Sequence, residues 1–137
     1  MRAQPKYFVT TFGEPYAHKH PVNGACYPHR PGWVRRLGVE EGDVMLLYCA
    51  AKYPGHDREA PGIGIVLRTE IGQAEDIIYY RYLPFEQPLK REAIVACLDE
   101  AEKRKFTVPH YIANWVIEVK NPASLRKVLC KRAINWP

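Results

Sequence analysis

The longest uninterrupted run of apolar residues, at positions 44–51, constrains the fold more than any other feature of this chain. It reads VMLLYCAA, so apolar side chains would point to both sides of an extended strand. A strand of this composition must be covered on both faces, whereas a membrane-spanning helix needs about 20 apolar residues. The run therefore predicts a central strand between two packed layers, in a soluble protein.

The length and composition suit one globular domain over residues 1–137. The 137 residues are 47% apolar and 26% charged, which is enough apolar material for a core. The ends show no signal-peptide pattern. The four cysteines, Cys26, Cys49, Cys97 and Cys130, are widely spaced, and three of them lie in apolar segments. We therefore expect a cytoplasmic protein in a reducing compartment.

Alternating apolar residues and turn residues predict four strands besides the central one. These expected strands are residues 6–12, 61–69, 76–83 and 115–120. Between the first strand and residue 31 the chain is rich in Pro, Gly and His, which predicts a long loop of the kind that is usually functional. In the strand at 61–69, Gly62 and Gly64 share one face, where something can approach the backbone closely.

Three helices are expected. They are residues 33–37, stopped by Gly38; residues 89–105; and a last helix with Asn121 as N-cap and Pro122 in its first turn. The residues expected to face the core from the last two helices are Ile94, Cys97, Leu98, Ala101, Leu125, Val128 and Leu129. Most connections are too short for parallel crossovers, so the pattern predicts an α+β fold with a small mixed, strongly curved sheet or open pseudobarrel flanked by helices.

The distribution of charge favours a polyanionic partner. The net charge is +5, and residues 15–39 contain no Asp or Glu but hold basic side chains interleaved with Tyr16, Tyr27 and Trp33. Such a mixture suits phosphates and stacked bases. The candidate phosphate contacts are Lys19, Arg30, Arg35, Arg36, Lys52 and Arg58. The alternative for each of them is an ordinary solvated surface residue.

Two segments in order carry a resemblance to a known family. Residues 42–48 read GDVMLLY, residues 61–66 read PGIGIV, and Trp115 opens a later strand. In this respect the chain resembles the EVE domain of the PUA-like superfamily, whose relatives include the YTH and ASCH domains and the thymocyte nuclear protein, over residues 7–119. The resemblance implies a small pseudobarrel with a pocket for a modified or flipped-out base in DNA or RNA.

The resemblance also implies which residues line that pocket. They are Asn23, Trp33, Tyr48, Cys49, Ala50, Pro61, Gly62, Ile63 and Trp115. Trp33 and Tyr48 would be the stacking walls, and Asn23 with backbone groups near Gly62 would read the base edge. Each aromatic residue could instead be a core residue. The residues after Tyr48 are polar in better-known members but Cys49 and Ala50 here, which leaves the identity of the base open.

Other chemistry is less well supported by the spacing of residues. The sequence His18-x-His20 with Cys26-x-x-His29 matches no standard zinc site, and Gly62-x-Gly64 lacks the third glycine of a dinucleotide loop, so we expect neither a metal nor another cofactor. The leading hypothesis is a non-enzymatic nucleic-acid-binding module. The alternatives are a small ASCH-like amidohydrolase or nucleotide-processing enzyme, with Lys52, Thr69 and Glu70, and a structural protein whose basic face binds acidic partners.

Overall fold

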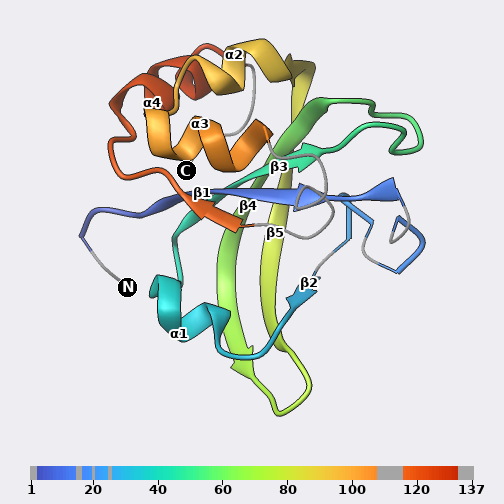
Figure 1. Ribbon diagram of the computed structural model, residues 1–137. Helices are drawn as coiled ribbons and strands as arrows, with labels where there is room; N and C mark the ends of the chain where they lie inside the picture. The colour runs from blue at the N-terminus through green and yellow to red at the C-terminus, as the bar shows by residue number, and fades with distance from the viewer. Residues whose placement is uncertain (1–2, 15–16, 20, 25, 108–115, 133–137) are drawn as a thin grey trace.

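The computed structural model describes residues 3–14, 17–19, 21–24, 26–107 and 116–132. Within these residues the chain forms six strands and four helices (Figure 1). In chain order they are β1 (Tyr7–Phe12), β2 (Cys26–His29), α1 (Trp33–Leu37), β3 (Val44–Cys49), β4 (Glu59–Ile71), β5 (Asp76–Lys90), α2 (Arg91–Val95), α3 (Glu100–Thr107), β6 (Val116–Glu118) and α4 (Ala123–Cys130).

The strands form one mixed sheet in the order β2-β5-β4-β3-β1-β6. β1 and β3 are parallel, and the other four neighbouring pairs are antiparallel. The sheet curls strongly into a half-barrel, with α2, α3 and α4 gathered at one end and α1 at the opposite end (Figure 1). The predicted α+β fold with a small, curved mixed sheet is thus confirmed.

Strand β3 is buried on both faces, as its composition requires. Its residues alternate between two apolar clusters. The first cluster, which we call the helical core, contains Leu46 and Tyr48 together with side chains of α2, α3 and α4. The second, which we call the aromatic core, contains Met45 and Leu47 of β3 and Trp33 of α1. β3 therefore separates two layers, and neighbouring residues along it serve different cores.

Asp43 fixes the start of β3, which gives the Gly-Asp pair a structural role. Its buried carboxylate accepts hydrogen bonds from the backbone N–H of Lys6 and of Glu40, both at 2.9 Å. The backbone N–H of Gly42 donates to the carbonyl of Val66 in β4 at 2.8 Å. The turn before β3 is thereby joined to the chain leading into β1 and to β4.

Helix α1 has the bounds expected from the sequence, and both of its ends are satisfied. Gly38 ends the helix with φ of +67°, a conformation that glycine adopts readily, and its N–H donates to the Val34 carbonyl. At the other end, Asp76 of β5 accepts hydrogen bonds from the N–H groups of Gly32 and Val34, at 2.8 and 3.2 Å. A long-range carboxylate therefore replaces a local N-cap.

The expected loop before residue 31 contains a strand that the sequence interpretation missed. Residues of β2 pair antiparallel with β5, and Tyr27 is 1% exposed and donates to the Thr11 carbonyl at 3.0 Å. Pro28 is tolerated because β2 is an edge strand, where one side of the backbone needs no partner.

The prediction of a single helix over residues 89–105 was wrong. β5 continues to Lys90, and the helical chain is split into α2 and α3. A capping box starts α3, because Asp99 accepts from the Glu102 N–H at 2.8 Å and Glu102 accepts from the Asp99 N–H at 3.0 Å. Ile94, Cys97 and Leu98 are in the helical core as expected, but Ala101 is exposed.

Near the C-terminal end, the expected strand over residues 115–120 corresponds to β6, and Trp115 lies outside the described residues. Helix α4 begins at Ala123, with Pro122 rather than Asn121 at its N-cap position and no side-chain cap. Leu125 and Leu129 are fully buried, as predicted. None of the described helices is long and apolar enough to cross a membrane.

Candidate functional site

A cavity of about 620 Å³ opens between the β1–β2 loop and the β3–β4 loop. Val22 and Tyr53, 4% and 6% exposed, form its floor. The other lining residues, which are exposed or half-buried, are Glu14, Ala17, His18, Asn23, Pro54, His56 and Tyr82. The floor is therefore buried, with one aliphatic and one aromatic side chain, and polar side chains form most of the rim.

Two tyrosines hold the β1–β2 loop in place at the floor, Tyr53 from the β3–β4 loop and Tyr80 from β5. The Tyr53 hydroxyl accepts a hydrogen bond from the Val22 N–H at 2.8 Å, and the Tyr80 hydroxyl donates to the Val22 carbonyl at 2.9 Å. Burial raises the pKa of both phenols above the ordinary value. They are thus neutral hydrogen-bonding groups near pH 7, and they place Val22 over the aromatic core.

Tyr80 and Tyr82 occupy the glycine face of β4. A Cβ at Gly64 would lie 2.7 Å from the Tyr80 ring, and one at Gly62 would lie 2.9 Å from the Tyr82 ring and 2.5 Å from the Leu83 carbonyl oxygen. The close approach expected at this face is therefore made by the protein's own β5 strand. The glycines contribute to the site indirectly, because they allow Tyr82 to lie against the sheet where it lines the cavity.

His56 on the rim is held by a buried carboxylate. Its Nδ1 lies 3.0 Å from Oε2 of Glu59, which is 8% exposed, and the other carboxylate oxygen of Glu59 accepts from Nζ of Lys90. Burial by itself would raise the pKa of Glu59, but the hydrogen bonds from Lys90 and His56 outweigh it and leave that pKa below the usual value. Glu59 is therefore charged and orients the imidazole.

Cys49 is near this group but is not reactive. It pairs with Glu59 across β3 and β4 and belongs to the aromatic core. Burial, with a smaller effect of the Glu59 charge, raises the pKa of the Cys49 thiol to about 12. The thiol is thus protonated at neutral pH and serves as a small core residue.

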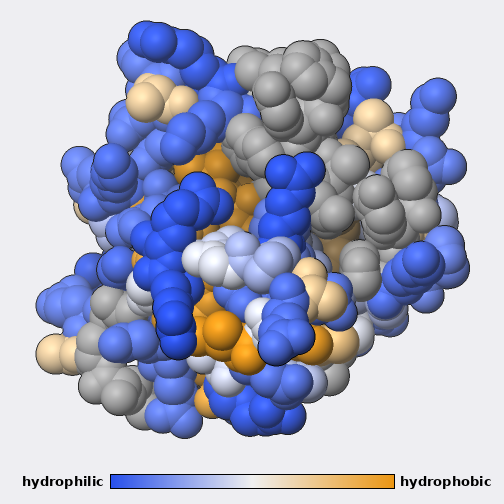
Figure 2. Space-filling view, turned by 60° about the horizontal axis from the view of Figure 1, so that its bottom comes forward, coloured by the Kyte–Doolittle hydropathy of each residue, from blue (hydrophilic) through white to orange (hydrophobic). Residues whose placement is uncertain are grey.

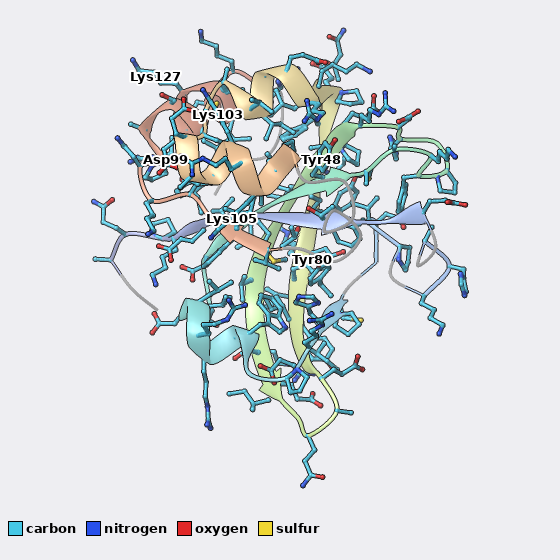
Figure 3. The ribbon with its side chains drawn as sticks, in the orientation of Figure 1. Tyr48, Tyr80, Asp99, Lys103, Lys105 and Lys127 are labelled. Carbon is cyan, nitrogen blue, oxygen red and sulfur yellow. The ribbon has the colours of Figure 1, made fainter. Side chains whose placement is uncertain are left out.

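The structure does not bring together the two expected stacking walls. Tyr48 is in the helical core, where its ring centroid lies 4.7 Å from that of Phe106, and Trp33 is in the aromatic core. Trp33 donates from Nε1 to the Asp76 carbonyl and packs edge-on against Tyr27. Figure 3 shows Tyr48 beside α3 and away from Tyr80, a member of the aromatic core. Trp33 and Tyr48 therefore cannot enclose one base.

Of the other residues expected in the pocket, Asn23 lines the cavity. Ala50 and Ile63 are buried in the helical core, and Pro61 and Gly62 are buried in β4. Trp115 is outside the described residues. Ala50 and Ile63 do not line the cavity for the same reason as Tyr48, because each lies on the face of the sheet that α2, α3 and α4 cover.

The expected phosphate contacts are all exposed but fall into two groups. Lys19, Lys52 and Arg58 are in the two loops that form the cavity. Arg30, Arg35 and Arg36 are at the end of β2 and in α1, at the other end of the sheet (Figure 1). The first group shares its loops with the cavity, although none of its three side chains lines it.

The three residues expected for an amidohydrolase do not come together. Thr69 and Glu70 pair with Ile78 and Ile77 near the β4–β5 turn, whereas Lys52 precedes the opposite end of β4. At about 3.3 Å per residue, the length of β4 separates them. No group of three or more possible metal-binding side chains occurs among the described residues, which exclude His20.

Sequence interpretation missed Tyr53, Tyr82, His56 and Glu59. A usable signal existed for two of them, because His56-x-x-Glu59 places an imidazole and a carboxylate three residues apart in a loop. Tyr82 shares the period-two face of Tyr80 in β5, but its contact with the glycine face of β4 depends on strand register.

On the face of the molecule shown in Figure 2, hydrophilic side chains predominate and strongly hydrophobic atoms appear between them. A second hollow, of about 610 Å³, lies along α4 and is lined by Ala123, Arg126, Lys127, Cys130 and Lys131. No protein-family model matches the sequence, and the chain is similar to no curated protein and to no solved structure in the comparisons made.

Proposed function

We propose that this protein binds nucleic acid and holds an unpaired, modified or flipped-out base in the cavity between the β1–β2 and β3–β4 loops. The observation that carries the proposal is the cavity itself, lined by Tyr53 and Tyr82 and bordered by a mainly polar rim. Its volume falls in the range of about 300–1,000 Å³ that is usual for small-ligand sites. The resemblance to EVE and PUA-like domains suggests the same class of ligand, but of the described residues it implied for the pocket only Asn23 lines this cavity.

The chemistry of the lining suits a nucleobase. Tyr53 and Tyr82 offer neutral aromatic groups, and Asn23 and Glu14 offer donors and acceptors for a base edge. Outside the cavity, Lys19 and Lys52 are exposed in the same two loops and can contact phosphates. A base inside and a backbone outside would thus be bound by adjacent groups.

The site of action proposed with this function is the cytoplasm. All four cysteines are free; Cys49 and Cys97 are buried, and Cys130 is exposed. An exposed free thiol is compatible with a reducing compartment.

A binding panel tests the proposal. Single-stranded and duplex RNA and DNA, each with and without common base modifications, would be titrated against the protein at fixed salt. We expect single strands or a modified base to bind more tightly than unmodified duplex, because an unpaired base costs less to extrude. Equal, weak binding to every oligonucleotide would contradict a base-holding cavity.

A further inference from the structure

The rim of the cavity carries a pair of groups that base recognition does not require. His56 is 35% exposed in its side chain and lines the cavity, while its Nδ1 is engaged by the buried carboxylate of Glu59. Lys90 fixes the second oxygen of that carboxylate. Glu59 of β4, held by Lys90 of β5, thus sets the orientation of this imidazole.

Such an arrangement is suited to proton transfer. A carboxylate bound to Nδ1 fixes the ring orientation, favours a proton on Nδ1 and stabilises the imidazolium once Nε2 has taken a second proton. Nε2 is the nitrogen that Glu59 does not engage.

A second imidazole lies on the opposite loop. His18 lines the same cavity from the β1–β2 loop and is exposed, whereas the floor between the loops is formed by buried Val22 and Tyr53. A base on the floor would leave its ribose and the adjoining phosphate at the level of the rim. Both histidines would then be near the sugar-phosphate backbone.

We propose that the cavity cleaves RNA, with His56 and His18 as the catalytic residues and Glu59 as a positioning residue; the inference rests on the nucleic-acid binding proposed above. Nε2 of His56 removes the proton of the ribose 2′-hydroxyl, and the 2′-oxygen forms a bond to the adjacent phosphorus. The bond from phosphorus to the 5′-oxygen of the next nucleotide breaks, and protonated His18 gives that oxygen a proton. The products are a 2′,3′-cyclic phosphate and a free 5′-hydroxyl.

This reaction is balanced by RNA and the two histidines alone. After the reaction, His56 loses its extra proton to solvent and His18 takes up a proton from solvent, so both return to their starting states. DNA lacks the 2′-hydroxyl, so it would occupy the cavity without being cut. The inference therefore replaces the expectation of a purely non-enzymatic module by that of a strand-cleaving enzyme.

The test is cleavage of a single-stranded RNA by the full chain, with products identified by mass spectrometry. We expect a 2′,3′-cyclic phosphate from RNA and no cleavage of the matching DNA or 2′-O-methyl RNA. His56→Ala and His18→Ala should each lower the rate by on the order of 100-fold or more. Glu59→Gln should lower kcat with little change in KM. Added imidazole should restore part of the rate to His56→Ala, which a structural role for His56 would not allow.

The matched control is His29→Gln, because His29 is on β2 and does not line the cavity. It should cleave RNA as the parent does. RNA that is bound but yields no cyclic phosphate, or cleavage that persists in both histidine variants, would overturn the inference and leave the binding proposal standing. Failure of every oligonucleotide to bind would instead refute the binding proposal and this inference with it.

Discussion

Tyr82 is the residue whose side chain most directly tests the placement of the base. It lines the cavity and rests against Gly62, so its ring is available to a ligand from one side. We expect Tyr82→Ala to weaken binding of the preferred oligonucleotide by about 1–3 kcal/mol, the value of one base-stacking contact. Titration followed by fluorescence anisotropy would measure the change.

Tyr79→Ala is the matched control, because Tyr79 is on the same strand but contacts Arg68 and Glu70 near the β4–β5 turn. It should bind as the parent does, and equal losses in the two variants would place the base elsewhere. Trp33 and Tyr48 are unsuitable probes. Since each is buried in a core, truncation to alanine should cost about 3–5 kcal/mol of stability and reveal nothing about base selection.

At the scale of elements, the capping box that starts α3 allows a prediction about the free energy of unfolding. Asp99→Ala removes one half of the capping box and should lower the free energy of unfolding by about 1 kcal/mol. Glu102→Ala should cost more, because the buried Glu102 carboxylate also accepts from the Lys120 N–H at 3.0 Å. Urea unfolding would measure both, with exposed Lys105→Ala as a control that changes little. Equal losses from Asp99→Ala and Lys105→Ala would contradict the cap.

The link between the β3–β4 loop and β5 predicts a dependence of stability on pH. The pKa of Glu59 is lower in the folded protein, so its contribution is present above the unfolded value, near 4.5, and is lost as the pH falls through the lower folded value. The stability difference between the parent and Glu59→Gln should therefore be constant near neutral pH and shrink below about pH 4.5. Thermal unfolding from pH 7 to pH 3 would follow it. A difference that does not change over this range would refute the ionic link.

The elements that local pattern determines were predictable, and those that distant contacts determine were not. The apolar run identified β3 and the following glycine identified the end of α1, because both signals lie in the residues of the element itself or next to it. β2 was missed because it is stabilised by pairing with β5 and by the burial of Tyr27, which both depend on distant parts of the chain. The candidate site followed the same rule: Asn23 lines the cavity, whereas Tyr48 enters the helical core, since only the sheet's packing decides which core each β3 residue enters.

At the scale of the whole molecule, cations are distributed over more than one face. Lys52 is in the β3–β4 loop, which borders the cavity, whereas Lys103, Lys105 and Lys127 are on α3 and α4 (Figure 3). If nucleic acid enters the cavity, binding should weaken as salt rises, because bound phosphates release counterions. Lys52→Gln should reduce the slope of log K against log salt by about 1 for the lost phosphate contact.

Lys127→Gln serves as the matched control for that experiment. It removes the same charge from α4, where the second hollow lies, and should leave the slope unchanged. Affinity that does not depend on salt would contradict phosphate binding altogether. A slope reduced by Lys127→Gln and not by Lys52→Gln would move the nucleic-acid path to the helical end of the sheet.

The place of β1 in the sheet has a consequence for how the chain is made. β1 pairs with β3 on one side and with β6 on the other, and Phe8 is opposite Glu118. At a synthesis rate of about 5–20 residues per second, one side of β1 stays unpaired for on the order of ten seconds after β1 leaves the ribosome. Its sequence, YFVTTF, is uncharged and all buried in the finished protein. An open, uncharged strand edge pairs readily with other chains. Fragments that end before β6 should therefore collect in inclusion bodies, and slower translation of residues 50–118 should lower the yield of folded protein.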